Sequence, residues 1–292
     1  MSFCSKLQAC KDIALNRLIK NKDPFRVMSI DDTINYIIEN DLSVSRYGDG
    51  EALMMANQMN ESFQTYDREF AKKLMCVAKN PIEKHLTCIP DIFIDLSKYT
   101  DDAQAWFNGF LKRKKYLYYR YFDYQKVYGN AFITRPYMDL KDKGNSPHYY
   151  EMLKNIWCER DLLIVEGEFS RLGVGNDLFD GANSIARILC PAVNAYRHYS
   201  EILPAIEKNA NNKLVLIALG ATATVLAYDL AKDGYRAIDI GHVDIEYEWM
   251  LMGATSKVPI KSKYVNEAKD GHCQDNIVDE KYNREIVCKI GI

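Results

Sequence analysis

The 292-residue sequence contains no run of about 18 consecutive apolar residues, the length that a membrane-spanning helix needs. Its N-terminal residues lack an apolar core followed by a small-residue cleavage site, so we expect no export signal. No internal repeat or low-complexity linker interrupts it. The eight cysteines form no Cys-x-x-Cys pair and follow no zinc-ligand spacing. We therefore expect a cytoplasmic protein whose cysteines are free thiols.

The two signs of charge are nearly balanced, because the chain has 38 Lys and Arg residues and 40 Asp and Glu residues. A nucleic-acid-binding domain is normally basic, so this balance argues against nucleic acid as a partner. Glycine (15) and proline (8) are scarce, while hydrophobic residues make up 48% of the chain. Such a composition is typical of a globular protein with a sizeable core.

The pattern of strands and helices is clearest in the second half of the sequence, where apolar, β-branched runs alternate with helical patterns. The runs lie at residues 161–167, 184–191, 213–220 and 235–241, and helical patterns lie at 196–209 and 222–233. Strands that are apolar throughout and alternate with helices predict a parallel sheet covered by helices on both faces. In the first half we expect helices at 6–20, 31–40, 51–59 and 101–113, and strands at 43–48 and 86–90. The fold class is therefore α/β, with a mostly parallel, doubly wound sheet.

Open parallel sheets bind ligands at the carboxyl ends of their strands. In this sequence, polar side chains and glycines follow several of the predicted strands. They are Arg46, Asp49 and Glu51 after 43–48; Glu166, Glu168, Ser170, Arg171, Gly173, Gly175, Asn176 and Asp177 after 161–167; Thr222 and Thr224 after 213–220; and His242, Asp244 and Glu246 after 235–241. We expect a binding site among these residues.

Asp49 and Glu51 are separated only by Gly50, at the junction of a predicted strand and a predicted helix. In extended backbone the two carboxylates project to the same side and can reach one cation. Two hard carboxylates suit Mg²⁺ or Mn²⁺, which often complete their coordination with phosphate oxygens. The alternative is that Asp49 caps the following helix and Glu51 favours its positive end. Spacing alone leaves both interpretations open.

The loop Ser170–Asp177 (SRLGVGND) places two glycines after a strand, as phosphate-binding loops do. It is not a dinucleotide fingerprint, because Leu178 stands where a third glycine is required. Arg171 favours an anion, since a guanidinium can bind a diphosphate with two parallel bonds. A tight connecting loop is the alternative. Thr222 has a similar ambiguity, because it can cap its helix or belong to an anion-binding helix N-terminus.

His242 precedes several acids at the end of the last predicted strand, and a histidine there can serve as ligand, base or orienting group. A structural, hydrogen-bonding histidine is the alternative. The tyrosine-rich segment 116–128 is most simply explained by core or interface packing, although exposed tyrosines can stack on sugar or base rings.

Several motifs in one order resemble the bacterial GT-D fold glycosyltransferases, a family first catalogued as a domain of unknown function. They are SRYGDGE (45–51), NAFITRPYMDLKD (130–142), VEGEFSRLGVGNDLFD (165–180), LGATATVLAYDLAKDGYRAIDIGHVDIEYEW (219–249) and VPIKSKYVNEAKDG (258–271). One departure is Ala221, where proline is expected. The resemblance implies an N-terminal helical segment (1–40), a Rossmann-like GT-D domain (41–271) and a C-terminal extension (272–292).

The resemblance further implies metal-dependent transfer of a sugar from a nucleotide diphosphate, typically a UDP-sugar such as UDP-glucose, to a glycan on a surface glycoprotein or polysaccharide. The family's DxE motif falls on Asp49 and Glu51, which would hold Mn²⁺ or Mg²⁺. An inverting enzyme needs a base, and Asp244, Glu246 and His242 are the candidates, with Glu168 a weaker one. The residues expected to bind the donor are Arg46, Ser170, Arg171, Gly173, Gly175, Asn176 and Thr222.

Two other functions remain open at this point. The chain can be a non-catalytic nucleotide- or glycan-binding subunit of a glycosylation complex, or a metal-dependent phosphoesterase that uses the same acids. The sequence also leaves the oligomeric state open, a homo-oligomer included.

Overall fold

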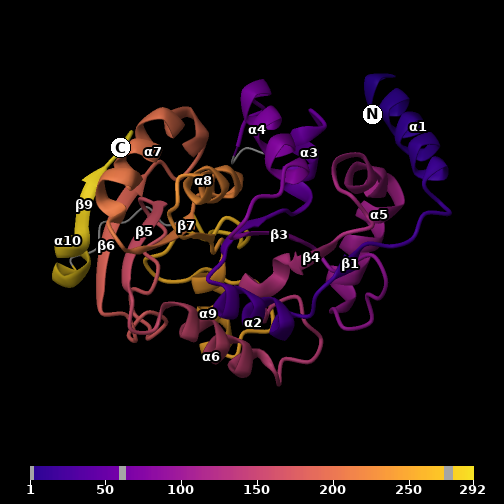
Figure 1. The fold of residues 1–292 in the computed structure, drawn as a ribbon. Coiled ribbons are helices and arrows are strands. Elements are labelled where there is room, and N and C mark those ends of the chain that lie inside the picture. Colours follow the sequence, from indigo (N-terminus) through magenta and orange to yellow (C-terminus); the bar gives the residue numbers. More distant parts are fainter. Residues whose placement is uncertain (1–2, 59–63, 273–278) are drawn as a thin grey trace.

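The computed structural model describes residues 3–58, 64–272 and 279–292, and these form one nine-stranded sheet in which all neighbouring strands run parallel (Figure 1). The strand order is β1-β4-β3-β2-β8-β7-β5-β6-β9. The strands are β1 (Arg26–Val27), β2 (Ser43–Arg46), β3 (His85–Ile89), β4 (Val127–Asn130), β5 (Asp161–Gly167), β6 (Ser184–Cys190), β7 (Leu214–Ala218), β8 (Ala237–Asp239) and β9 (Ile286–Lys289). The predicted parallel α/β sheet is confirmed.

Helices cover both faces of the sheet, with α2, α6 and α9 on one face and α7 and α8 on the other (Figure 1). The helices are α1 (Phe3–Leu18), α2 (Ile30–Asn40), α3 (Asp49–Met55), α4 (Arg68–Lys79), α5 (Asp101–Tyr121), α6 (Ser146–Trp157), α7 (Tyr199–Ala210), α8 (Ala221–Lys232), α9 (Val243–Leu251) and α10 (Glu280–Glu285), with 3-10 turns η1 (Ala131–Thr134) and η2 (Ala195–His198).

Strand β5 shows why the central strands are apolar at every position. Leu162 and Ile164 pack toward the helices of one face, whereas Leu163 and Val165 pack toward α7 and α8 on the other. All of these side chains are fully buried. Successive residues of a strand point to opposite faces, so a strand covered on both faces needs an apolar residue at each position.

Several elements differ from the sequence-based prediction. Helix α5 continues to Tyr121 rather than ending at residue 113, and most of the tyrosines of segment 116–128 are buried in or beside it. The short strands β1, β4 and β9 are not foreseen by the pattern, because two to four residues carry too little periodicity. Met59, where a predicted helix ends, lies outside the described residues. Cys273, which follows His272, also lies outside them.

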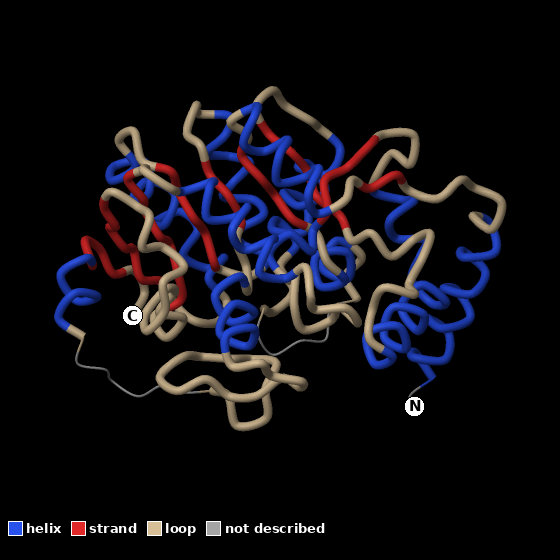
Figure 2. The backbone as a smooth tube through the Cα atoms, turned by 90° about the horizontal axis from the view of Figure 1, so that it is seen from below, coloured by secondary structure: helices blue, strands red, loops and turns tan. Residues whose placement is uncertain are grey.

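The two ends of the chain lie at opposite edges of the sheet, as the views from the front and from below both show (Figures 1 and 2). Strand β9 falls in the segment that we separated as a C-terminal extension, and it pairs with β6 of the same sheet. At the other edge β1 pairs with β4. Both terminal segments therefore contribute strands to this sheet.

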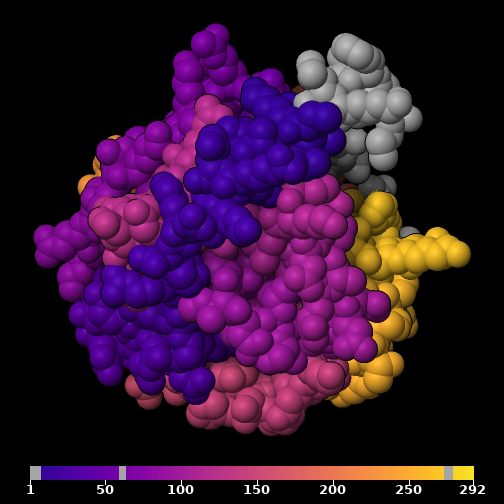
Figure 3. Space-filling model, turned by 90° about the vertical axis from the view of Figure 1, so that its right-hand side faces the viewer, coloured from indigo at the N-terminus to yellow at the C-terminus, as the bar shows by residue number. Residues whose placement is uncertain are grey.

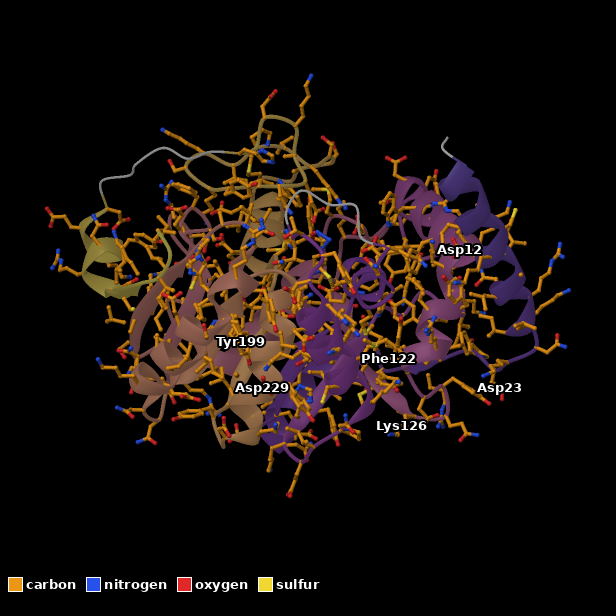
Figure 4. The ribbon with its side chains drawn as sticks, turned by 90° about the horizontal axis from the view of Figure 1, so that it is seen from above. Asp12, Asp23, Phe122, Lys126, Tyr199 and Asp229 are labelled. Atoms are coloured by element: carbon orange, nitrogen blue, oxygen red, sulfur yellow. The ribbon has the colours of Figure 1, made fainter. Side chains whose placement is uncertain are left out.

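Polar pairs tie peripheral helices to the core. Asp12 of α1 accepts hydrogen bonds from Lys114 (2.5 Å) and the Tyr116 hydroxyl (2.8 Å) of α5, and the N-terminal residues lie against this side of the molecule (Figures 3 and 4). Nearer the middle of the molecule, Asp229 of α8 accepts a hydrogen bond from the hydroxyl of Tyr199 of α7, and the two residues lie close together in Figure 4. These contacts fix α1 against α5, which is distant in sequence, and α7 against the following helix α8.

The two halves of the sheet meet where β2 lies beside β8, and side chains make much of this junction. Val44 pairs in register with Ile238. The Ser45 hydroxyl donates to the Thr224 carbonyl (2.6 Å), and the Thr224 hydroxyl donates to the Arg46 carbonyl (2.9 Å). The first half of the chain supplies one side of the junction and the second half supplies the other, so this contact joins them.

His85 extends the junction to β3. Its Nε2 lies 2.8 Å from the Ser45 hydroxyl, whose own proton goes to Thr224, so Nε2 carries hydrogen and donates. Nδ1 is buried and makes no hydrogen bond within the described part of the chain. Burial lowers the pKa of His85 to about 4. The imidazole is therefore neutral in the folded protein at pH 7.

This arrangement predicts a loss of stability in acid. In the unfolded chain His85 binds a proton below about pH 6.5, whereas in the folded chain it does so only below about pH 4. The contribution of neutral His85 to the free energy of unfolding is therefore complete above pH 6.5 and is lost as the pH falls to 4. Wild type should lose up to about 3 kcal/mol more than His85→Gln over this interval, measured by urea unfolding. Exposed His148→Gln should follow wild type, and equal pH profiles for His85→Gln and wild type would refute the assignment.

Candidate functional site

A cleft of about 1320 Å³ opens at the carboxyl ends of β2, β5, β7 and β8. Residues at or just after these strand ends line it, among them Arg46, Gly48, Asp49, Gly50 and Glu51 at β2; Gly167 and Ser170 at β5; Leu219 and Gly220 at β7; and Gly241, His242 and Asp244 at β8. The site expected from the sheet rule thus has a real cavity at its centre.

Asp49 and Glu51 lie in the first turn of α3 and not in extended backbone, so the expectation that they project to one side because they are two residues apart in a strand is wrong. Both side chains nevertheless line the cleft. Glu51 Oε2 accepts the Gly48 N–H (2.6 Å), and Asp49 Oδ1 accepts the Gly50 N–H (3.1 Å). Capping therefore belongs to Glu51, at the third helical position, rather than to Asp49. Burial raises the pKa of Glu51 to about 7. Within the described residues, Asp49 Oδ2 and Glu51 Oε1 make no hydrogen bond, so each carboxylate keeps one oxygen for a ligand.

These two carboxylates fit a cation that is completed by a substrate. No cluster of three or more His, Cys, Asp or Glu side chains suited to a metal exists in residues 3–58, 64–272 and 279–292. Mg²⁺ is commonly held by one or two protein carboxylates together with waters and substrate phosphates. The donor set of Asp49 and Glu51 matches that pattern, in which the protein supplies only part of the coordination.

Arg46 is held by the β8 end on the opposite side of the junction. Its Nη2 forms an ion pair with Asp239 Oδ1 (2.8 Å), and its Nε donates to the Asp239 carbonyl (2.9 Å). Gly241 has φ of 41°, and a Cβ atom there would lie 1.9 Å from Arg46 Nη2. Glycine is thus required for the guanidinium to occupy this position. The guanidinium lies in the cleft with much of its charge balanced by Asp239.

The sequence did not single out a group of charged residues that completes the cleft. Arg135 forms an ion pair with Glu267, which also binds Lys257 (2.6 Å) and lies 3.5 Å from His242 Nε2. Burial opposes ionisation of Glu267, but Arg135, His242 and Lys257 outweigh it and lower its pKa to about 2. In the sequence, Arg135 and Glu267 lie in the motif-bearing segments 130–142 and 258–271, and those motifs are the signal that points to them.

His242 lies at the N-terminus of α9 and lines the cleft. Its Nε2 is 3.0 Å from the Asn266 side-chain oxygen and therefore donates to it. Burial, helped by the nearby Arg135 charge, lowers the pKa of His242. The ring is neutral near pH 7, and Nδ1 makes no hydrogen bond within the described residues. His242 is thus placed to accept a proton.

Asp244 also reaches the cleft but is fully engaged by the protein. Its Oδ1 accepts from the Gly173 N–H and the Asn176 side chain (both 2.8 Å), and its Oδ2 pairs with Lys263 (2.7 Å). Lys263 also pairs with Glu248 (2.9 Å) and is itself buried. This network favours a structural role for Asp244.

The glycine loop gives its amide donors to carboxylates of the protein. The Gly173 N–H goes to Asp244, and the Leu172 N–H goes to Glu166 Oε2 (2.8 Å). Gly173 has φ of 74° and packs against Phe179, where a Cβ would approach to 2.5 Å. The buried Arg171 donates to the Ser262 carbonyl. The loop is therefore a packed connection, and only its start at Ser170 and Leu172 lines the cleft.

Other predicted residues lie away from the cleft lining. Glu246 is buried, accepts the Met138 N–H (2.8 Å) and has its pKa raised to about 7 by burial. Thr222 is the second residue of α8, and its buried hydroxyl has no hydrogen-bond partner in the described chain, so it is not the cap. Gly173, Gly175 and Asn176 border a separate hollow of about 340 Å³ beside α10.

The structure thus brings together only part of the predicted set. The members that share the cleft are Arg46, Asp49, Glu51, Ser170, His242 and Asp244; those that do not line it are Arg171, Gly173, Gly175, Asn176, Thr222, Glu246 and Glu168. Residues that are neighbours in a loop or helix can have one side chain in the cleft lining and the next outside it. A sequence motif alone does not show which of them lines the cleft.

None of the helices in the described part of the chain combines the length and apolar character that crossing a membrane requires. The cysteines that the structure describes with their side chains are free: Cys10, Cys76, Cys88, Cys158, Cys190 and Cys288.

Comparison with known proteins points to one family. Residues 44–268 match the family model described as glycosyltransferase GT-D fold. A solved structure titled a new glycosyltransferase (DUF1792) from Streptococcus sanguinis is 43% identical and superposes with a TM-score of 0.85, covering 91% of this chain and 99% of that one.

Two curated relatives are similar over nearly the whole chain. A probable glycosyl transferase Gly of Streptococcus gordonii is 43% identical over 270 residues, 90% of this chain. Glycosyltransferase GlyD of Streptococcus pneumoniae is 42% identical over 282 residues, 96% of this chain. This chain spans only 39% and 34% of the lengths of these two relatives.

The buried network around Asp244 predicts a large effect of Lys263. Lys263→Met leaves Asp244 and Glu248 without their cation in a buried site, which should lower the free energy of unfolding by about 3 kcal/mol. Urea unfolding measures this. Lys261→Met, at an exposed position two residues earlier, is the control and should change stability by less than about 0.5 kcal/mol. Equal midpoints for the two variants would contradict the buried network.

Proposed function

Because this chain belongs to the GT-D fold glycosyltransferase family, we propose that it transfers a sugar from a nucleotide diphosphate donor, a UDP-sugar such as UDP-glucose, to a glycan acceptor on a surface glycoprotein or polysaccharide. One observation carries the proposal. Asp49 and Glu51 line the cleft at the carboxyl ends of the strands, each with an oxygen that the described residues leave unbonded. We assign the reaction to the cytoplasm, in agreement with the free cysteines.

Asp49 and Glu51 would hold Mn²⁺ or Mg²⁺, which supplies Lewis-acid stabilisation to the departing nucleoside diphosphate. The hydrogen bond that Glu51 accepts from the Gly48 N–H positions it for this role, because it fixes the carboxylate at the N-terminus of α3. The same bond leaves Oε1 without a hydrogen bond to the described residues, so this oxygen would bind the cation. Capping and metal binding are thus compatible in one side chain.

Two arginine side chains from the N-terminal half of the sheet would bind the diphosphate. Arg46 comes from the end of β2, and Arg135 follows η1; both line the cleft. Acids partly balance each of them, since Arg46 pairs with Asp239 and Arg135 with Glu267. These pairs hold the guanidinium groups in place before the donor arrives, so little reorganisation accompanies binding.

His242 is the base that the geometry supports best among Asp244, Glu246 and His242. Asp244 is engaged by Lys263 and by two N–H donors, and Glu246 lies outside the cleft lining. His242 lines the cleft with a neutral ring whose orientation is fixed by Asn266. Its Nδ1 would take the proton of the attacking acceptor hydroxyl.

The metal role of Glu51 can be separated from its capping role. Glu51→Gln keeps an oxygen for the Gly48 N–H but removes the negative charge, so the fold should be retained while Mn²⁺-dependent binding of UDP weakens more than about tenfold. Isothermal titration of UDP with and without Mn²⁺ measures this. Asp49→Asn should behave alike, and Glu39→Gln on α2 is the control.

Metal-independent UDP binding that is equal in wild type and Glu51→Gln would remove Glu51 from the cation site. Screening UDP- and GDP-sugars for metal-dependent nucleotide release tests the reaction class. Release of inorganic phosphate from simple phosphate esters, without need of a nucleotide sugar, would instead favour a phosphoesterase. Binding of UDP with no release of UDP from any donor would favour a non-catalytic subunit.

The base assignment predicts a selective loss of turnover. His242→Asn should lower the transfer rate by about 100-fold or more and leave UDP binding unchanged, because the base acts on the acceptor proton. Steady-state UDP release in the presence of acceptor, together with titration of UDP, measures both quantities. His148→Asn, an exposed histidine outside the cleft, is the control. Undiminished turnover by His242→Asn would refute the assignment.

A further inference from the structure

One wall of the cleft is aromatic rather than charged. It is formed by one face of α5, with Ala103, Trp106, Phe107 and Phe110 along it. These positions are three and four residues apart, so they share a side of the helix. Part of this face is packed in the core, since Ala103 and Phe110 are buried and Phe107 packs against the same cluster. The face also borders the cleft.

Trp106 is the exposed member of this wall. Its neighbours Ala103 and Phe110 are buried, and Phe107 packs against Tyr99 (ring centroids 5.0 Å apart) and Phe132 (5.6 Å). Trp106 is 63% exposed, and within the described residues its ring has no aromatic or cationic partner. Core packing therefore does not account for a large apolar side chain at this position.

The charges near this wall favour a neutral ligand over a nucleotide. The first turn of α5 places Asp102 in the cleft lining, and Asp139 lines it as well. The nearby Lys257 is engaged by Glu267 (2.6 Å) and Asp139 (3.8 Å). An anionic diphosphate is disfavoured beside these acids. A neutral sugar has hydroxyl groups that can donate hydrogen bonds to a carboxylate. It also has an apolar C–H face on which an indole ring can stack.

We propose that Trp106 and Asp102 form the acceptor subsite of the cleft, where the indole ring stacks on a saccharide unit and the Asp102 carboxylate accepts hydrogen bonds from its hydroxyls. This assignment rests on the proposed function, since it concerns the second substrate of the same cleft. The donor occupies the side with Asp49, Glu51 and Arg46. The aromatic wall of α5 therefore selects and orients the glycan that receives the sugar.

The tryptophan content allows a binding test that does not depend on turnover. The chain has three tryptophans, and Trp157 and Trp249 are fully buried while Trp106 is exposed. Acrylamide quenching of fluorescence will therefore report mainly on Trp106. A panel of neutral disaccharides (cellobiose, maltose, lactose and chitobiose) should include at least one that protects Trp106 from quenching when UDP and Mn²⁺ are present. Trp106→Tyr removes the fluorophore at this position, so the protection from quenching should no longer be observed.

Kinetics test the same subsite through turnover. With the protective disaccharide as acceptor, Trp106→Ala should raise the acceptor KM by about tenfold or more, whereas the conservative Trp106→Tyr should restore most of the affinity. Release of UDP to water, without acceptor, should not change. Asp102→Asn should raise the acceptor KM, and Asp101→Asn, which does not line the cleft, is its matched control.

Two outcomes overturn the acceptor subsite: protection of Trp106 by UDP alone, which would place the nucleotide base there, or no protection by any disaccharide of the panel. Failure of the proposed function gives a different result, since wild type would then release no UDP from any nucleotide sugar, with or without disaccharide. Normal UDP release in water with an unchanged acceptor KM in Trp106→Ala refutes the subsite alone.

Discussion

The ion pair between Arg46 and Asp239 is the contact on which the rest of the structure depends. It joins the ends of β2 and β8, the strands at which the N-terminal and C-terminal halves of the sheet meet. The bonds that Ser45 and Thr224 make across the same junction support it. Because parallel strands present their carboxyl ends on one edge, fixing these two ends also fixes the walls of the cleft.

A second constraint is the need to satisfy buried carboxylates. Asp244 and Glu166 are buried, and they take N–H groups of the loop after β5 as partners, together with Lys263 and Arg187. Buried charges are stable only when paired and hydrogen-bonded. The glycine loop serves this internal network, which explains why a loop with the appearance of a phosphate cradle does not present its amides to the cleft.

The cleft itself is chemically divided. Carboxylates and guanidinium groups gather near the junction of β2 and β8, whereas α5 contributes aromatic side chains. A reaction between an anionic donor and a neutral acceptor needs two such regions side by side, since each substrate is desolvated against a different surface. The division follows from topology: strand ends supply the polar residues, and a helix beyond the sheet supplies the apolar ones.

The sequence by itself determined the parallel sheet, its central strands and the position of Asp49 and Glu51 at its carboxyl edge, because apolar strands such as β5 and a strand followed by a helix leave a local signal. Only the tertiary structure decided which residues meet. It turned Arg171 and Thr222 inward, engaged Asp244 with Lys263, and brought Arg135 and Glu267 into the cleft from segments more than 100 residues apart. The direction of a side chain and its partners depend on long-range packing, which no local pattern encodes.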